Sequence, residues 1–489
     1  MATPPASAID LGGLTLEAFG GRPVAVLGLA RSGIALTRFL CDRGAQVTVY
    51  DTRSAAALGE ALAALGDRRP RLLLGPDVDP AEALVGQALI CTSPSVSSRY
   101  PTTEPRLRSA LTAVEAEGRV PVVSEVDLFL RLCPAATVGV TGTKGKTTTS
   151  SLTAAVLAAG DAPAVLGGNI GIPLIERLPQ LSPRHRVVLE LSELQLPTLS
   201  RGTDIAVYTH VTSDHLDRHG SLEAYRAVKR RLAELLPAGG ALVRNDDDPV
   251  VSTYAAPDGA RMVGYSQASP VGDGVGVVDG WITAGSALAP AGHDGRVMAV
   301  DEIPMPGQHN VSNVLAATAV GLLHGVAPGD IAAAVRGFGG VEHRLERVTE
   351  IAGVTYINDS QGTQPDAVIA AVRAFEGPLV LIAGGRSKGV PVDALAAAVA
   401  ERVTAAVLMG ETAEQLEVAF SAAGLDRIER VDSMAAAVRV ATALARESTP
   451  ATVLLSPAAA SFDMFHDYEA RGAAFKGAVA DLSAGESGR

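Results

Sequence analysis

Short apolar runs alternate along most of the chain with longer segments in which apolar residues recur at helical spacing. The run at 23–27 leads through a glycine-containing turn into a helical pattern, and a second run ends at Asp51. The run at 137–140 is followed by a similar turn and helical pattern, and the alternation resumes after 341. Apolar strands that alternate with helices are typical of parallel sheets covered by helices. The pattern therefore predicts an α/β fold.

The pattern divides into three stretches, which suits a chain of 489 residues because domains average roughly 150 residues. We expect a Rossmann-like domain at 1–133, a central P-loop ATPase-like domain at 134–340 and a second Rossmann-like domain at 341–489. Within the central stretch, the segment from Val243 to about Val300 contains short runs broken by Gly, Asp and Pro. We expect a small region of short strands there, beside the parallel sheet.

Composition narrows the class of protein. Hydrophobic residues make up 47% of the chain and aromatic residues 4%, so the core is expected to consist of Ala, Val and Leu. A net charge of -12 argues against nucleic acid as a partner. Three cysteines (Cys41, Cys91 and Cys133) have no metal-ligand spacing and suit reduced thiols. Neither a signal peptide nor a membrane span is visible, so we expect a soluble, cytoplasmic protein.

The sequence TGTKGKT at 141–147 has the composition of a phosphate-binding loop between a strand and a helix. Gly142 and Gly145 let the backbone N–H groups turn inward, the helix N-terminus favours an anion, and Lys146 adds a cation. The hydroxyl of Thr147 stands where a phosphate-bound Mg²⁺ needs an oxygen. The strict P-loop spacing requires glycine at Val140, so the match is to a shorter form. A glycine-rich turn without a ligand is the alternative.

The first turn of the chain resembles a dinucleotide fingerprint, with Gly28 and Gly33 at its first and third positions and Asp51 at the end of the next strand. The middle position is Ala30. In the fingerprint, glycine at this position lets the backbone approach the pyrophosphate, so alanine counts against NAD or flavin as the ligand. Another nucleotide-bearing ligand is favoured over a redox cofactor, and a structural turn without ligand is a further alternative.

Polar residues follow several of the expected strands. Glu190 ends one strand of the central domain, and the sequence TSDHLDRHG follows the next, so both could reach a Mg²⁺ at one edge of the sheet. His215 and His219 have helical zinc spacing but no evident third ligand. Asn310 and Asn313, three apart on a helix, either meet an adenine or cap the helix. The last domain has polar strand ends at Asn358, Asp359, Ser360, Arg386, Lys388, Ser456 and Ser461.

Nine motifs in a fixed order resemble those of the Mur ligases: TGTKGKTTT, GGNIG, LELS, DHLDRHGSLEAYRAVK, GQHNVSN, EHRLE, NDSQGTQPDA, IAGGRSKG and LLSPAAASFDMF. The resemblance runs from Val24 to Phe475, nearly the whole chain. It implies an ATP-dependent ligase that adds glutamate to the cytoplasmic peptidoglycan precursor UDP-N-acetylmuramoyl-L-alanine through an acyl phosphate. It further implies that the protein is a monomer with small-molecule substrates.

The resemblance also implies which residues bind ATP and Mg²⁺. The ATP phosphates are assigned to Gly142, Thr143, Lys144, Gly145, Lys146, Thr147 and Thr148. Other contacts with ATP are assigned to Asn310, Asn313, Arg344 and Asp359. Catalytic roles are assigned to Lys146, Glu190, His215 and Lys229. The ligands of two Mg²⁺ ions are assigned to Thr147, Glu190, His215 and Lys229. In the family, the position of Lys229 is carbamylated, which would convert a cation into an anionic metal ligand. The residue pattern alone does not distinguish Lys229 from the arginines around it.

The substrate contacts follow from the same resemblance. UDP is assigned to the first domain, at Ala30, Arg31, Ser32, Asp51, Thr52 and Arg53. The muramoyl-alanine part is assigned to Asn169, Ser192 and Arg218. Glutamate is assigned to the last domain, at Thr363, Lys388, Ser461, Phe462 and Tyr468.

Two departures from the family pattern qualify these assignments. Gln361 stands where many relatives have lysine, and Lys144, commonly asparagine, is our hypothesis for the compensating cation. Glu193 stands where serine is usual and has no explanation. Two other functions are kept as alternatives: a variant ligase that adds L-glutamate, and a catalytically silent nucleotide-binding partner.

Overall fold

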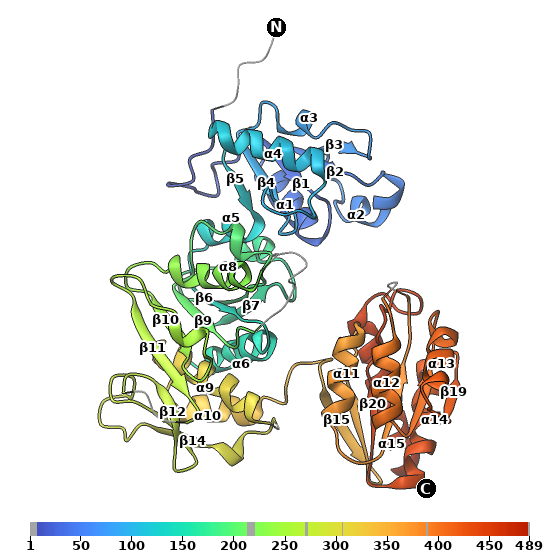
Figure 1. Ribbon diagram of the computed structural model, residues 1–489. Helices are drawn as coiled ribbons and strands as arrows, with labels where there is room; N and C mark the ends of the chain where they lie inside the picture. Colours follow the sequence, from blue (N-terminus) through green and yellow to red (C-terminus); the bar gives the residue numbers. More distant parts are fainter. Residues whose placement is uncertain (1–6, 213–220, 269–271, 306, 388–389, 488–489) are drawn as a thin grey trace. The chain divides into compact units, whose positions relative to one another are not determined.

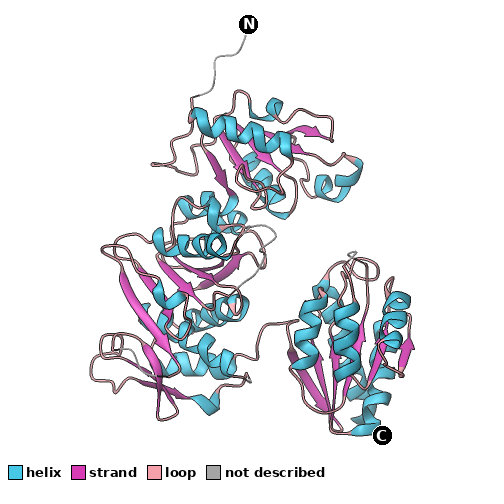
Figure 2. Ribbon diagram, in the orientation of Figure 1, coloured by secondary structure: helices cyan, strands magenta, loops and turns pink. Residues whose placement is uncertain are grey.

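A computed structural model of the chain describes residues 7–212, 221–268, 272–305, 307–387 and 390–487 (Figure 1). The chain forms two compact units, Met1–Phe338 and Gly339–Arg489. The first unit contains a five-stranded and a nine-stranded sheet, and the second contains a six-stranded sheet. Helices and strands alternate through most of both units (Figure 2). The predicted α/β fold class is therefore confirmed.

The first sheet is entirely parallel, with the strand order β3-β2-β1-β4-β5. Its strands are β1 (Pro23–Leu27), β2 (Gln46–Asp51), β3 (Arg71–Leu74), β4 (Leu89–Thr92) and β5 (Val122–Ser124). The helices between and after them are α1 (Arg31–Asp42), η1 (Ala56–Leu58), α2 (Gly59–Ala63), α3 (Ala81–Leu84), α4 (Pro105–Glu117) and α5 (Glu125–Leu132). Successive side chains of β1 point to opposite faces of the sheet, as in any strand. Val24 and Val26 belong to one buried cluster, and Ala25 and Leu27 belong to another.

The second sheet has the order β14-β13-β12-β11-β10-β9-β6-β8-β7. Its parallel strands are β6 (Ala136–Thr141), β7 (Ala164–Gly168), β8 (Arg186–Glu190), β9 (Ile205–Tyr208), β10 (Ala241–Asn245), β11 (Arg261–Ser266) and β12 (Val275–Val278). Antiparallel strands β13 (Trp281–Ala284) and β14 (Arg296–Ala299) complete it. The short strands expected between Val243 and Val300 therefore extend the central sheet instead of forming a separate layer.

The longer helices of this part of the first unit are α6 (Lys146–Ala158), α8 (Leu222–Glu234), α9 (Gln308–Leu323) and α10 (Pro328–Gly337). Shorter helical turns are η2 (Leu174–Gln180), η3 (Leu196–Thr198), η4 (Val251–Thr253) and η5 (Val300–Glu302). Helices α6 and α9 pack directly on each other, and both supply residues to the core beneath β6 and β9. This packing places the start of α9 beside the start of α6.

The second unit is a mixed sheet with the order β15-β16-β20-β17-β18-β19. Its strands are β15 (Glu346–Ile351), β16 (Val354–Asn358), β17 (Leu379–Ala383), β18 (Ala405–Leu408), β19 (Ile428–Arg430) and β20 (Ala451–Leu455). Helices α11 (Pro365–Arg373), α12 (Asp393–Arg402) and α13 (Ala413–Ala422) share one core. Helices α14 (Met434–Ala445) and α15 (Tyr468–Ser487) contribute to the other, and η6 (Arg446–Ser448) follows α14. Strand β17 sends Leu381 to the first core and Val380 to the second, so both faces are covered.

Strand β15 was not predicted. It pairs antiparallel with β16 at the edge of the sheet, and its sequence ERVTEI mixes charged and apolar residues, with Arg347 and Glu350 exposed and Ile351 buried. Such a strand exposes one face to water, so it lacks the continuous apolar run that identified the buried strands. None of the helices in the described part of the chain has an apolar stretch that would reach across a bilayer.

Candidate active site

A glycine-containing loop joins β6 to α6 at the carboxyl edge of the second sheet. Gly142 has a φ of +157°, and a Cβ there would lie 2.0 Å from the Thr209 hydroxyl oxygen. Gly145 has a φ of +84° and caps the N-terminus of α6. Lys146 Nζ donates to the carbonyl oxygens of Gly142 at 3.1 Å and Thr143 at 3.0 Å. The loop thus combines a close backbone approach, a helix N-terminus and a cation, which together suit a phosphate group.

A second lysine approaches the loop from α8. Lys229 is completely buried, and its Nζ donates to the Gly142 carbonyl at 3.0 Å and to the Thr141 hydroxyl at 3.3 Å. Tyr225, four residues earlier on the same helix face, bonds through its hydroxyl to that of Thr143 at 2.8 Å. Both side chains of α8 that contact the loop lie on the face that also buries Leu232 and Ala233. Lys229 shares the buried face of α8 with Tyr225, Leu232 and Ala233. This helical spacing of apolar residues distinguishes Lys229 from the neighbouring arginines and was the signal available in the sequence.

Glu190 ends β8 and is buried, with 2% of its surface exposed. Its Oε1 accepts a hydrogen bond from Asn169 Nδ2 at 2.9 Å, whereas its Oε2 is buried and has no hydrogen-bond partner among the residues that the structure describes. A buried carboxylate oxygen without a donor is costly unless a cation or ligand group meets it. Because oxygen ligands are what Mg²⁺ prefers, Glu190 suits that ion, together with the hydroxyl of buried Thr147. His215 lies outside the described residues.

The first two turns of α9 contact the start of α6 beside the loop. Asn313 Oδ1 accepts a hydrogen bond from the Thr149 hydroxyl at 3.0 Å, and its Nδ2 donates to Asn310 Oδ1 at 3.0 Å. A Cβ at Gly145 would lie 2.9 Å from Asn313 Oδ1. The two asparagines therefore lie against the start of α6, and Asn313 braces the loop.

Three residues near this loop were not found by sequence reasoning. The backbone carbonyl of His210 accepts a hydrogen bond from the Thr143 N–H, so the residue lines the loop. The His210 ring lies 3.4 Å from Asp248 Oδ2 and 3.4 Å from Asn245 Nδ2. Burial alone would raise the pKa of Asp248, but hydrogen bonds from His210 and from backbone N–H groups hold it below its usual value. His210 follows β9, whereas Asn245 and Asp248 lie at the end of β10, so the contact joins two strand ends more than 30 residues apart and left no local motif to recognise.

The turn after β1 is tightly built in the first sheet. A Cβ at Gly33 would lie 1.8 Å from the Gly28 carbonyl oxygen, so glycine is required where α1 meets the turn. Asp51 accepts hydrogen bonds from the Leu29 N–H at 2.8 Å and from Arg53 Nε at 2.9 Å. Asp51 therefore fixes the turn that carries the other predicted UDP contacts, which are Ala30 and Ser32 at the start of α1, exposed Arg31, and Thr52.

Two of the residues predicted to contact the muramoyl-alanine part of the substrate, Asn169 and Ser192, lie close to Glu190. Asn169 bonds to Glu190 through its side chain, and its carbonyl accepts a hydrogen bond from Arg31 Nη2 at 3.3 Å. Ser192 is buried, and its hydroxyl donates to Gln195 Oε1 at 3.1 Å. Arg218 lies outside the described residues.

In the second unit, Asp359 follows β16 and lies beside the end of β20. Its carboxylate accepts hydrogen bonds from the Ser456 hydroxyl at 2.6 Å and the Leu345 N–H at 3.1 Å. Burial raises the pKa of Asp359 to about 6, although these hydrogen bonds and the nearby Arg344 favour the charged form. Of the other predicted residues, Ser461 is buried, Thr363 and Tyr468 are half-buried, Arg344 and Phe462 are exposed, and Lys388 lies outside the described residues.

Replacing Asp359 by asparagine is expected to raise stability while it lowers ATP turnover. A carboxyl group whose folded pKa is raised binds its proton more tightly in the folded state, so its ionisation destabilises the fold as pH rises from about 4 to about 6. Asp359→Asn removes that cost, and we expect a gain of roughly 1–3 kcal/mol at pH 7.5 that shrinks toward pH 4.5. Urea unfolding followed by circular dichroism at both pH values measures it. A loss of stability at pH 7.5 would contradict the assignment.

Comparisons with known proteins agree with the geometry. Residues 22–114 match the model of the "Mur ligase MurD-like, N-terminal domain", residues 140–321 the "Mur ligase middle domain" and residues 343–459 the "Mur ligase, glutamate ligase domain". A UDP-N-acetylmuramoylalanine–D-glutamate ligase of Symbiobacterium thermophilum is 39% identical over 94% of this chain and 98% of its own. The ligase of the same name from Pelotomaculum thermopropionicum is 37% identical over 96% of this chain and 100% of its own.

Two solved structures share the fold at low sequence identity. The UDP-N-acetylmuramate–alanine ligase of Thermotoga maritima is 16% identical, with a TM-score of 0.52, over 96% of this chain and all of that one. A structure of the ligase MurF from Acinetobacter baumannii is also 16% identical with a TM-score of 0.52, over 89% of this chain and 90% of that one.

Proposed function

Because the chain belongs to the Mur ligase family, we propose that it joins D-glutamate to UDP-N-acetylmuramoyl-L-alanine at the expense of ATP, in the cytoplasmic synthesis of peptidoglycan precursors. The observation that carries the proposal is the loop at 142–147, where two lysines and a helix N-terminus converge near Glu190, whose buried Oε2 has no hydrogen-bond partner in the described part of the chain. The relatives that bear the name of this ligase are similar along nearly the whole chain. The protein acts as a monomer in this proposal.

The chemistry requires two anions to meet. The carboxylate of the alanyl group attacks the γ-phosphoryl group of ATP, ADP leaves, and the glutamate amine then displaces phosphate from the acyl phosphate. Lys146, whose Nζ reaches the Gly142 carbonyl, supplies positive charge at the loop. Mg²⁺ bound by Thr147, Glu190 and His215 would neutralise charge that develops on the phosphoryl oxygens. Asn310, Asn313, Arg344 and Asp359 bind the rest of ATP.

The role of Lys229 in the proposal is that of a carbamylated, anionic side chain that binds another Mg²⁺. Its complete burial beside the loop supports the modification, because a buried ammonium is costly, whereas a carbamate is an anion whose charge a bound Mg²⁺ would offset. Removal of carbon dioxide and bicarbonate from the assay should then lower the rate, and their return should restore it. A rate that does not change would contradict carbamylation.

The remaining substrate assignments divide between the units. UDP is placed at the turn held by Asp51, and the muramoyl-alanine part is placed near Asn169, Ser192 and Arg218. Glutamate is placed in the second unit, near Thr363, Lys388, Ser461, Phe462 and Tyr468. The division into domains at 1–133, 134–340 and 341–489 belongs to the same proposal.

Phosphate release from ATP in the presence of UDP-N-acetylmuramoyl-L-alanine tests the function directly. We expect release with D-glutamate, because the ligases named above act on that amino acid, and almost none without an amino acid. Release with L-glutamate alone would identify a variant ligase. The absence of release with either isomer, in a protein that still binds ATP, would favour a silent nucleotide-binding partner.

A further inference from the structure

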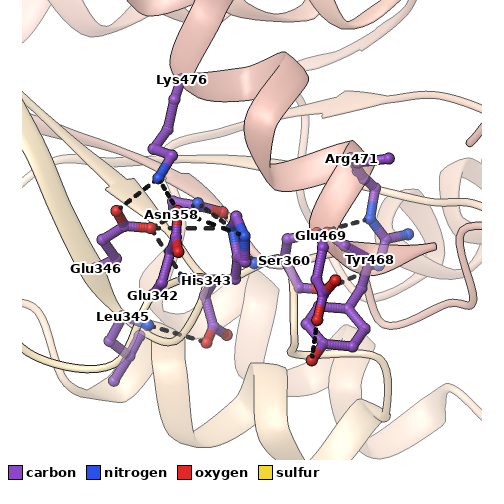
Figure 3. Close-up of polar contacts among 12 residues, drawn as sticks. Glu342, His343, Leu345, Glu346, Asn358, Ser360, Tyr468, Glu469, Arg471 and Lys476 are labelled. Atoms are coloured by element: carbon purple, nitrogen blue, oxygen red, sulfur yellow. Dashed lines mark hydrogen bonds and ion pairs between the residues drawn. The ribbon is translucent and has the colours of Figure 1, made fainter. Parts of the chain in front are cut away.

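One face of helix α15 contacts the segment at 342–346 in the second unit (Figure 3). Tyr468, Gly472 and Lys476 are four residues apart and therefore lie on the same side of the helix. The Tyr468 ring meets the His343 ring edge to face, with centroids 6.2 Å apart. A Cβ at Gly472 would lie 2.1 Å from His343 Nδ1, so glycine allows the helix to approach this closely. The next turn of the same face presents Lys476.

Lys476 joins the two glutamates of the segment. Its Nζ forms ion pairs with Glu342 and, at 3.0 Å, with Glu346 Oε1. The side chain of Glu346 is partly buried, with 19% of its surface exposed, whereas that of Glu342 is 65% exposed. The Glu346 pair is therefore the better shielded of the two and is expected to contribute more. The two ion pairs hold the helix and the segment together.

The second carboxylate oxygen of Glu346 is hydrogen-bonded to His343 and Asn358. Glu346 Oε2 accepts hydrogen bonds from the His343 N–H at 2.9 Å and from Asn358 Nδ2 at 2.8 Å. The same Asn358 nitrogen lies 2.9 Å from His343 Nδ1. Glu346 is thus oriented by Lys476 on one side and fixes His343 and Asn358 on the other, as Figure 3 shows.

The backbone of the segment needs this support. His343 and Leu345 have φ values of +63° and +44°, in the left-handed region that residues with bulky side chains seldom adopt. Arg344 lies between them, and the Leu345 N–H donates to Asp359 Oδ1 at 3.1 Å. The His343 carbonyl accepts a hydrogen bond from the Gln361 N–H at 2.9 Å. Two strained residues therefore flank Arg344 and tie it to the loop that carries Asp359.

A metal ion is a poorer explanation of this cluster. Ligand atoms of Glu342, His343 and Glu346 all lie within 4.8 Å of one another, close enough for a cation to be considered. The Lys476 ammonium already pairs with both carboxylates, and His343 Nδ1 already meets the Asn358 amide. The Lys476 ammonium therefore already supplies the positive charge that the two glutamates need, and the ion pairs link helix α15 to the segment at 342–346.

We propose that Lys476 is a positioning residue for the nucleotide, which clamps Glu342 and Glu346 to α15 and so holds Arg344 and Asp359 in the arrangement that binds ATP. The inference rests on the proposed function, in which Arg344 and Asp359 contact ATP. Lys476 itself touches no substrate in this account. Its loss should weaken ATP binding while the other two substrates bind as before.

The test compares Lys476→Met, which keeps the length but removes the charge, with Lys476→Arg, which keeps the charge. Arg427→Met is the matched control, because Arg427 and Glu447 form an exposed ion pair elsewhere in the same unit. In the full-length protein, we expect Lys476→Met to raise KM for ATP about tenfold, with KM for the other substrates and kcat changed less than about threefold. Lys476→Arg and Arg427→Met should keep KM for ATP within about twofold of wild type.

Two outcomes would overturn the proposal: an unchanged KM for ATP in folded Lys476→Met, or an equal rise in all three KM values. If Lys476→Met fails to fold, Glu342→Gln breaks only the exposed pair and should raise KM for ATP about threefold; no change would again count against the clamp. Calorimetric binding of a non-hydrolysable ATP analogue to wild type and Lys476→Met separates this inference from the function. A wild-type protein without ligase activity refutes the function, whereas equal analogue affinities refute the clamp.

Discussion

Replacing Glu190 by glutamine is expected to lower the rate of ATP-dependent phosphate release by about 10²- to 10³-fold. Glutamine keeps the acceptor that Asn169 Nδ2 uses, but it removes the negative charge from the oxygen for which no described residue is a hydrogen-bond partner. Because that oxygen is available to Mg²⁺, the variant should also need a higher Mg²⁺ concentration for half-maximal rate. Its unfolding free energy should change by less than about 1 kcal/mol, since the hydrogen-bonded oxygen is preserved.

Asp204→Asn provides the matched control for Glu190→Gln. Asp204 precedes β9, at the amino ends of the parallel strands and therefore away from the loop at 142–147. Its Oδ2 accepts hydrogen bonds from the Thr137 N–H and hydroxyl, both at 2.8 Å. Its substitution should cost about 1 kcal/mol of stability and leave the Mg²⁺ dependence of the rate unchanged. If Glu190→Gln retained full activity at the Mg²⁺ concentration that is sufficient for wild type, Glu190 would not be a metal ligand.

Gly142→Ala is expected to abolish measurable ATP turnover and to destabilise the first unit by about 2–4 kcal/mol. The added Cβ would lie 2.0 Å from Thr209 Oγ1 and 3.0 Å from the His210 carbonyl oxygen. Thr209 cannot easily move away, because its hydroxyl donates to the Lys144 carbonyl at 2.6 Å. The loop must therefore shift, and its N–H groups and Lys146 shift with it. ATP binding by calorimetry and thermal unfolding measure the two effects.

The control for Gly142→Ala separates backbone strain from the clash. Gly239 has a φ of +81°, and a Cβ there would have no atom of the described residues within 4 Å. Gly239→Ala should cost about 1 kcal/mol from the left-handed conformation alone and leave ATP binding unaltered. If both variants bound ATP with wild-type affinity, the loop at 142–147 would not be the phosphate site.

The fold was predictable because its signals are local. Runs such as 137–140 bury both faces of a strand, and helices such as α6 begin at a glycine that the sequence displays. The same holds for the phosphate loop, whose glycines, lysine and threonines are contiguous. Strand β15 has only one buried face, and so its pattern is weak. The segment of short strands gave no sign that it continues the central sheet, since that depends on β10 pairing with β9 and on β11 pairing with β10.

The candidate site was less predictable, because its contacts join distant parts of the chain. Lys229 looks like part of a solvated charge run until α8 turns it toward the Gly142 carbonyl. Asn313 was interpreted as an adenine contact or a cap, and its partner Thr149 lies 164 residues away. Asp51 was recognisable as the residue that ends a strand, but the hydrogen bonds that its carboxylate accepts from Leu29 and Arg53 were not. Contacts of this kind depend on tertiary packing, which no single motif encodes.

Transfer of labelled oxygen tests the central claim most directly. The claim is that the loop at 142–147 presents ATP to the alanyl carboxylate of UDP-N-acetylmuramoyl-L-alanine, so that an acyl phosphate forms before glutamate attacks. With that carboxylate labelled with ¹⁸O, mass spectrometry of the phosphate released in the presence of D-glutamate should find one labelled oxygen from each turnover. Phosphate that carries no label, released along with the D-glutamyl product, would contradict the acyl phosphate and with it this account of the site.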